Sequence, residues 1–151
     1  MLISDILRSK ISRKSGEVTG SKVATIAPDA TVRALLAELA AYNFGALVVS
    51  ADGSTIAGIV SERDVVRRLN EQGGALLTES VSSIMTVDVH TCRSGDDVAA
   101  IRQTMTDRRI RHLPVVDGGK LVGLVSIGDV VKSTISELEA EKEQLVGYIT
   151  S

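Results

Sequence analysis

Two Ser-x-x-Asp segments, each directly after an apolar run, are the most regular polar feature of the sequence. The first places Ser61 before Asp64, and the second places Ser126 before Asp129. At a helix start, unpaired backbone N–H groups can bind an anion, and a carboxylate one turn later can accept two hydrogen bonds from a ribose diol. The same spacing also forms a capping box, which stabilises the helix by about 1 kcal/mol. Because capping and ligand binding are compatible, both interpretations remain open.

A basic cluster, Arg-Arg-Ile-Arg-His at residues 108–112, leads into an apolar run at residues 113–116. Such a cluster is often no more than a solvated surface. This one ends at a predicted strand edge near a Gly-rich turn and a helix start, where an arginine can bind phosphate through two hydrogen bonds. The corresponding upstream residues, 42–45, are Tyr-Asn-Phe-Gly and carry no cation. We therefore predict two sites that differ in their affinity for anions.

Composition excludes several classes of function. The 151 residues are 44% hydrophobic and 2% aromatic, so the core is aliphatic and rings that stack on single-stranded bases are nearly absent. The formal net charge of −2 leaves no basic excess for binding duplex nucleic acid. One cysteine and two distant histidines offer neither a disulfide nor the spacing of metal ligands. We find no Ser/His/Asp order, Gly-rich phosphate loop or paired acids, and therefore do not expect an enzyme.

No apolar run approaches the roughly 20 residues that span a bilayer. The stretch from Met1 to Leu7 contains Asp5 within its apolar residues, unlike the charged start and apolar block of a secretory signal. We therefore expect a soluble, cytoplasmic protein whose fold requires no metal and whose partners are neither a membrane nor nucleic acid.

An internal repeat organises the chain into two copies. Residues 58–66 and 123–131 are identical at six of nine positions. The other paired segments are residues 25–32 with 91–98, 46–49 with 113–116, and the lead-ins 3–7 with 81–85. Because the two lead-ins are further apart than the other pairs, copy one contains an insertion, which we locate around residues 10–21.

Each copy predicts the same elements in the order β-α-β-β-α. The first helices are predicted from apolar residues at a period of 3.6, which are Val32, Leu35, Leu36 and Leu39 in copy one and Val98, Ile101 and Met105 in copy two. Asp-Gly turns between apolar runs predict a hairpin in each copy. The second helices start at Ser61 and Ser126. The predicted strands are residues 23–26, 46–49 and 56–60 in copy one, and 89–92 and 113–116 with its hairpin partner in copy two.

We divide the chain into five segments, namely a lead-in helix and loop (1–22), copy one (23–72), a linker with the second lead-in (73–88), copy two (89–133) and a helical extension (134–151). The last helix is predicted to run to about Val146, further than its counterpart in copy one. Its apolar residues lie near 3-4 spacing, interrupted by Lys142, and could pack on a second subunit. The alternative is a solvated amphipathic terminus that packs on the core of its own chain.

These features resemble a tandem pair of cystathionine β-synthase (CBS) domains, the arrangement called a Bateman module. The resemblance covers about Ile3 to Lys132, and stand-alone bacterial CBS-pair proteins typically have this combination. The resemblance rests on three features: the duplicated Gly-h-h-Ser-x-x-Asp blocks, in which h is an apolar residue, the segment at residues 61–64 and the segment at residues 111–117. The resemblance implies an α/β (α+β) fold in which two β-α-β-β-α motifs, related by a pseudo-twofold axis, pack sheet to sheet, with a dimeric disc as the expected assembly.

The resemblance also implies two clefts that bind adenosine-containing ligands. By position, Asp64 and Asp129 would each hold a ribose diol, with Ser61 and Ser126 near phosphate or ribose. The adenine walls would come from Ala24, Asn43, Phe44 and Gly45 in the first cleft and from His90, Ile110, Arg111 and Leu113 in the second.

The phosphate contacts implied by the resemblance are less symmetric. Arg111 and His112 would reach across the pseudo-twofold axis to the nucleotide whose ribose Asp64 holds. Arg63 and Arg109 are further phosphate candidates. Copy one departs from the family pattern, because residues 44–47, Phe-Gly-Ala-Leu, replace the basic-Leu-Pro sequence. The Asp129 site would therefore receive fewer cations from across the axis than the Asp64 site.

We predict a non-catalytic regulatory module that binds AMP, ADP or ATP as a homodimer and reports to an unidentified regulated protein. Two alternatives remain. NAD(H) or S-adenosylmethionine could occupy the same clefts, since a ribose-binding Asp does not contact the far end of the ligand. A purely structural dimerisation module would use the Ser-x-x-Asp segments only as helix caps.

Overall fold

The structure, a computed structural model, describes residues 1–13 and 23–150. The loop predicted within segment 1–22 thus lies outside the described residues from position 14 on. The chain forms two compact units. The copy-one unit comprises Ser21–His90 and Asp117–Val122, and the copy-two unit comprises Met1–Gly20, Thr91–Val116 and Gly123–Ser151. Within the described residues, no helix is long and apolar enough to cross a membrane.

The copy-one unit is built on a three-stranded sheet with the order β1-β2-β3. Strand β1 (Thr25–Ile26) runs parallel to β2 (Ala46–Val49), and β2 pairs antiparallel with β3 (Gly58–Ser61). Helix α2 (Val32–Tyr42) buries Val32, Leu35 and Leu39 against this core, as predicted, whereas Leu36 is 36% exposed. Helix α3 (Glu62–Gln72) follows β3 directly.

The second sheet pairs β4 (His112–Asp117) with β5 (Lys120–Ser126). The predicted hairpin is confirmed, since Gly118 and Gly119 form the turn with φ of 56° and 78°, a region that favours glycine. The strand predicted at 89–92 is reduced to one parallel bridge between Cys92 and Val115. Helix α4 (Val98–Arg108) precedes this hairpin, and α5 (Ile127–Thr150) follows it.

The hairpin predicted in copy one is confirmed, because β2 and β3 pair antiparallel, but its loop covers residues 50–57 and is two residues longer than predicted. The intervening loop is stabilised by Asp52, whose Oδ1 accepts the N–H groups of Thr55 and Ser54 at 2.7 and 2.9 Å. These hydrogen bonds lower the pKa of the Asp52 carboxyl. A side chain that closes its own loop can thus replace a two-residue turn.

Each lead-in packs in the core of the unit that contains the other copy. Helix α1 (Ile3–Arg13) precedes copy one in the sequence, yet Ile3 and Ile6 are buried in the core of the copy-two unit. The lead-in of copy two follows the short 3-10 helix η1 (Gly73–Thr78) and begins with a second one, η2 (Val81–Ser83). It buries Val81 and Ile84 in the core of the copy-one unit. Each unit therefore needs the segment that precedes the other copy.

The glycine that opens each Gly-h-h-Ser-x-x-Asp block allows a lead-in to cross the strand. A Cβ on Gly58 would lie 2.7 Å from the carbonyl oxygen of Thr86 and 2.7 Å from Met85 Sδ. A Cβ on Gly123 would lie 2.5 Å from Leu7 Cδ2. At Gly58 the contact includes a backbone atom, so close packing explains this glycine, whereas at Gly123 the contact is with a side chain that can change rotamer.

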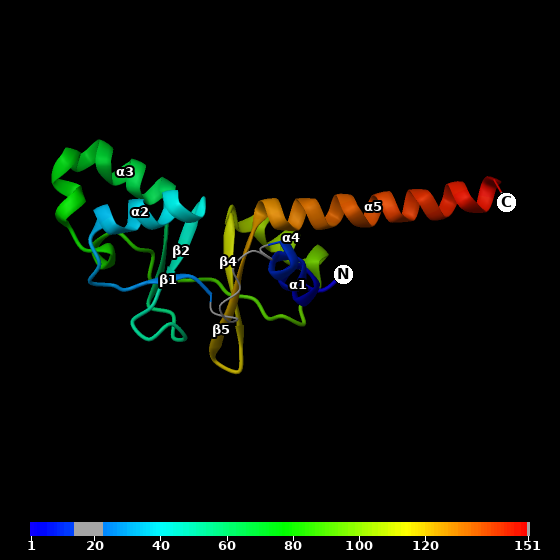
Figure 1. Ribbon diagram of the computed structural model, residues 1–151, viewed down its shortest axis with the longest axis horizontal. Coiled ribbons are helices and arrows are strands. Elements are labelled where there is room, and N and C mark those ends of the chain that lie inside the picture. The colour runs from blue at the N-terminus through cyan, green and yellow to red at the C-terminus, as the bar shows by residue number, and fades with distance from the viewer. Residues whose placement is uncertain (14–22, 151) are drawn as a thin grey trace. The chain divides into compact units, whose positions relative to one another are not determined.

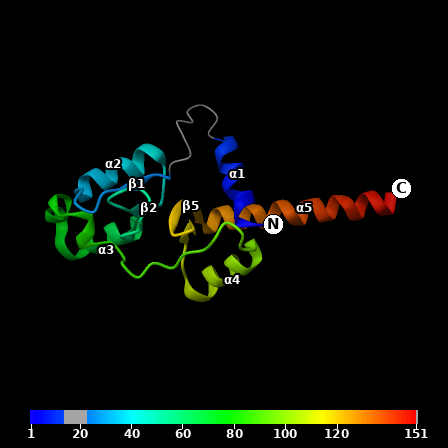
Figure 2. The same cartoon turned by 90° about the horizontal axis from the view of Figure 1, so that it is seen from below.

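Helix α5 extends well past α1 and α4, the other helices of its unit (Figures 1 and 2). It ends at Thr150, beyond the predicted end at Val146. Val130 and Ser133 are its buried residues. The outer apolar residues are exposed by half or more, and we call them the α5 stripe: Ile135, Leu138, Leu145, Val146, Tyr148 and Ile149. The outer helix therefore does not pack on the core of its own unit.

Candidate functional site

Both Ser-x-x-Asp segments form capping boxes at helix starts, as predicted. In copy one, the N–H of Ser61 donates to Asp64 Oδ2 at 2.8 Å, and the N–H of Asp64 donates to Ser61 Oγ at 3.4 Å. In copy two, the corresponding distances between Ser126 and Asp129 are 2.9 and 3.1 Å. Each carboxylate is therefore held beside the first turn of a helix.

The residue before the second strand of each copy is tied to the same helix start. The N–H of Glu62 donates to the carbonyl oxygen of Gly45 at 3.0 Å, and that of Ile127 donates to the carbonyl oxygen of Arg111 at 2.8 Å. In each unit, this backbone bond brings one predicted wall residue, Gly45 or Arg111, next to the capped serine. The two predicted sites thus share one local geometry.

The helix C-termini place two further predicted residues at equivalent positions. Asn43 ends α2 and Arg109 ends α4, and both have the left-handed conformation with φ of 54°. Asn adopts this conformation readily, whereas for arginine it costs about 1 kcal/mol. Arg109 thus turns the chain between α4 and β4, the segment that contains the basic cluster.

The remaining predicted wall residues differ in how much surface they offer a ligand. Ala24 and Phe44 are partly buried against the copy-one core, and the ring of Phe44 stacks on Tyr42 with centroids 5.6 Å apart. Ile110 packs partly buried against the copy-two core, whereas Leu113 is a core residue with 1% of its surface exposed. His90 and Arg63 are exposed, and His112 is half-buried at the start of β4.

Lys10 is a site residue that the sequence analysis missed. Its ammonium lies 2.7 Å from Asp129 Oδ2 and donates to the carbonyl oxygen of Leu124, also at 2.7 Å. Burial of Asp129 raises the pKa of its carboxyl, but the hydrogen bonds from Lys10 and from the N–H of Ser126 outweigh burial. The pKa of Asp129 therefore lies below its usual value of 3.8.

The signal that would have found Lys10 is its helical phase. Ile3, Ile6 and Lys10 are spaced three and four residues apart, so they share one face of a helix. A lysine on the same face as two buried isoleucines indicates a partner for its ammonium.

The low pKa of Asp129 predicts a pH-dependent contribution to stability. Because the carboxyl has a lower pKa in the folded chain, its ionised form stabilises the fold above pH 3.8 and loses this effect as pH falls through the folded-state value. Replacing Asp129→Asn should cost on the order of 1 kcal/mol at pH 7 and progressively less below pH 4. Urea unfolding of both proteins at pH 7 and pH 3.5 measures this difference. An equal penalty at both pH values would contradict it.

Within residues 1–13 and 23–150, no three His, Cys, Asp or Glu side chains gather as a metal site would require. Each unit therefore offers one candidate site of its own, a helix start with a serine and a carboxylate held beside it. Such an arrangement can accept sugar hydroxyls and donate to an anion.

Comparisons with known proteins agree with this architecture. The sequence matches the CBS domain family over residues 16–71 and 81–135. It is 35% identical to the CBS domain-containing protein CBSX3, mitochondrial, of Arabidopsis thaliana, over 97% of this chain and 71% of that protein. The crystal structure of the CBS-domain containing protein ATU1752 from Agrobacterium tumefaciens is similar with a TM-score of 0.78 and 38% identity, covering 89% of this chain and 99% of that one.

Two more distant crystal structures share the fold. CBSX2 in complex with AMP matches with a TM-score of 0.68 at 22% identity, over 89% of this chain and 96% of that one. The CBS domain pair of protein MJ0100, in complex with 5-methylthioadenosine and S-adenosylmethionine, matches with a TM-score of 0.71 at 21% identity, over 89% of this chain and 99% of that one. The predicted mixed α/β class, with five α-helices and small sheets among the described residues, is therefore confirmed.

Proposed function

This chain belongs to the CBS domain family, and from this premise we propose that it is a non-catalytic regulatory module that binds an adenine nucleotide, AMP, ADP or ATP, in the cytoplasm. The observation that carries the proposal is the duplicated capping box, which holds a carboxylate and a serine at the first turn of a helix in each copy. Two proteins of the same fold hold adenosine compounds, which supports this class of ligand.

The ribose of the first nucleotide binds Asp64 in this proposal. Asp64 Oδ2 accepts hydrogen bonds from Ser61 alone among the described residues, and Oδ1 accepts none. A carboxylate has about four acceptor positions, so Asp64 retains room for both hydroxyls of a ribose diol. The serine at the start of α3 then faces the phosphate side of the ligand.

The phosphate is assigned to cations near the helix starts. Arg63 lies in the first turn of α3, Arg109 and Arg111 lie between α4 and β4, and His112 is the first residue of β4. We propose that Arg111 and His112 reach across a pseudo-twofold axis to the nucleotide held by Asp64. A guanidinium binds phosphate through two parallel hydrogen bonds, which adds both affinity and orientation.

The assignment of Arg111 predicts a phosphate-specific loss. Replacing Arg111→Ala should weaken AMP binding about 10- to 100-fold, because a hydrogen bond to a charged group contributes about 1.5–3 kcal/mol. Adenosine, which lacks the phosphate, should bind the variant and the wild type equally. Calorimetric titration with both compounds measures this, and Arg33→Ala on the exposed face of α2 is the control. An equal loss for AMP and adenosine would refute a phosphate contact.

Assembly into a homodimer is proposed from the α5 stripe. These apolar residues are exposed by half or more and recur near 3-4 spacing, the pattern by which helices pair. The dimer would report ligand occupancy to a regulated protein, because a ligand shifts a conformational balance when its affinity differs between the two states. A purely structural dimerisation module would have the same stripe but would not respond to nucleotides.

A second candidate ligand class is favoured by the related structure that holds S-adenosylmethionine. NAD(H) belongs to the same alternative, since both compounds present an adenosine ribose to the carboxylate. They differ from AMP at the far end, where the phosphate or sulfonium lies. Dependence of binding on phosphate therefore separates S-adenosylmethionine from the adenine nucleotides, and direct comparison of NAD with ADP separates NAD(H) from them.

The proposed function is tested by thermal unfolding with AMP, ADP, ATP, NAD, NADH and S-adenosylmethionine, using protein shown to be free of carried-over nucleotide. A ligand at 100 times its dissociation constant adds about 2.7 kcal/mol to folding stability, which raises the Tm by several degrees. A selective increase with adenine nucleotides supports the proposal. No increase with any compound at millimolar concentration would favour the structural module.

A further inference from the structure

Lys10, on the lead-in helix α1, makes the two Ser-x-x-Asp sites chemically different. Asp129 Oδ2 accepts the ammonium of Lys10 at 2.7 Å and the N–H of Ser126 at 2.9 Å. The same ammonium donates to the carbonyl oxygen of Leu124 in β5. Both acceptor positions of this carboxylate oxygen are therefore taken by donors of the chain itself.

The equivalent carboxylate in copy one has no such cation. Asp64 Oδ2 accepts the N–H and the hydroxyl of Ser61, at 2.8 and 3.0 Å, and Asp64 forms no ion pair with any described residue. A serine hydroxyl can rotate toward another acceptor and leave the oxygen to a ligand. An ammonium with two acceptors, one of them charged, is harder to displace. Oδ1 accepts no hydrogen bond from a described residue at either carboxylate, so the two sites differ at Oδ2, where a ribose diol meets a displaceable hydroxyl in copy one and a bound ammonium in copy two.

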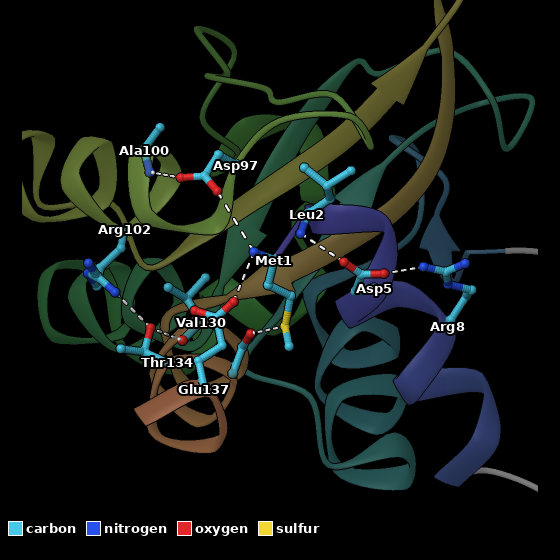
Figure 3. Close-up of polar contacts among 11 residues, drawn as sticks. Met1, Leu2, Asp5, Arg8, Asp97, Ala100, Arg102, Val130, Thr134 and Glu137 are labelled. Carbon is cyan, nitrogen blue, oxygen red and sulfur yellow. Dashed lines mark hydrogen bonds and ion pairs between the residues drawn. The ribbon is translucent and has the colours of Figure 1, made fainter. Parts of the chain in front are cut away.

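Contacts made by the N-terminal part of α1 fix the helix, and they thereby fix the position of Lys10 nearer its C-terminal end. Ile3 and Ile6 are buried in the copy-two core, with 0% and 4% of their surface exposed. The terminal ammonium of Met1 lies 2.9 Å from Glu137 of α5, and Figure 3 shows it between Glu137 and Asp97. These contacts determine the position of α1, so the ammonium two turns further along is directed at Asp129.

The repeat shows that the cation belongs to only one of the two lead-ins. The alignment that pairs Ile3 with Val81 pairs Lys10 with Asp88 when it is continued. The second lead-in has an acid at this position of the alignment and is not helical after Ser83, so it places no lysine where α1 places Lys10. The difference between the sites is therefore encoded in the sequence of the lead-ins.

We propose that Lys10 occupies the Asp129 site in place of a ligand, so that an adenosine compound fills the Asp64 site first. This inference rests on the proposed function. A ribose diol that uses both carboxylate oxygens of Asp129 must displace the ammonium from Oδ2, and its affinity is lowered accordingly. Because this displacement breaks the contact of Lys10 with β5, occupancy of the second site is linked to the packing of α1.

The test is a calorimetric titration with AMP in an Asp64→Ala background, in which only the Asp129 site remains. Replacing Lys10→Met keeps the apolar stem and removes the ammonium, and should raise the affinity of this site about tenfold. Lys10→Gln provides a second variant with the same expected gain. Arg8→Met is the matched control, since Arg8 is an exposed cation on the same helix that pairs with Asp5; it should leave the affinity unchanged.

Unchanged affinity, or no detectable binding, in both Lys10 variants would overturn the inference. A loss of affinity for AMP but not for adenosine would also overturn it, because Lys10 would then be a phosphate ligand. The wild-type chain separates these outcomes from a failure of the proposed function. If it binds no adenosine compound, the function itself is refuted, whereas two equal sites in the wild type refute only the role of Lys10.

Discussion

Changing Asp64→Ala is expected to lower the affinity for AMP about 100-fold. The carboxylate is proposed to accept both hydroxyls of the ribose, and each hydrogen bond to a charged group contributes at least about 1.5 kcal/mol. Losing both costs about 3 kcal/mol, which corresponds to about 100-fold in Kd. Calorimetric titration of the wild type and the variant under identical conditions measures this difference.

The control must separate loss of a ligand contact from loss of a helix cap. Asp64 accepts the N–H of Ser61, so the variant also loses about 1 kcal/mol of capping. Asp97→Ala removes a different capping carboxylate, which accepts the N–H of Ala100 at the start of α4. This control should lose stability but retain AMP binding. If Asp64→Ala retains wild-type affinity, the ribose does not bind there.

Changing Gly58→Ala is expected to destabilise the chain by about 1–3 kcal/mol, the usual cost of overpacking. The added Cβ would lie 2.7 Å from the backbone oxygen of Thr86, which accepts the N–H of Ile59 at 3.0 Å. A backbone atom in a paired segment cannot move aside alone. The Tm should therefore fall by about 5 °C for a chain of this size, measured by thermal unfolding.

Gly123→Ala is the matched control for Gly58→Ala. Its Cβ would meet the ends of the Leu7 side chain, which can change rotamer. We expect a cost of at most about 1 kcal/mol. Equal Tm values for Gly58→Ala and the wild type would show that the lead-in does not cross β3 as described.

The parts of the fold that were predicted from the sequence are those set by local interactions. The helix starts at Ser61 and Ser126 were predicted because a capping box needs only residues within one turn. Strand β2 was predicted with its observed bounds, since four consecutive apolar residues precede a break at Ser50. The Gly118-Gly119 hairpin follows equally from turn chemistry.

The features that were not predicted depend on contacts between segments that are far apart in the sequence. Lys10 and Leu124 are 114 positions apart, so their hydrogen bond cannot be read from local spacing. The exchange of the lead-ins is of the same kind, because Ile3 and Val81 have the same pattern and each could pack on either copy. The loop after β2 was predicted, but it is two residues longer than expected, and Asp52 stabilises it through its side chain.

The central claim is that the chain binds an adenine nucleotide at Asp64, and calorimetric titration of AMP into the wild-type chain tests it most directly. The protein is first shown to be free of carried-over nucleotide. We predict saturable heat with one tightly bound ligand per chain, followed by weaker binding at the site that Lys10 occupies. The absence of saturable heat up to millimolar AMP would contradict the account.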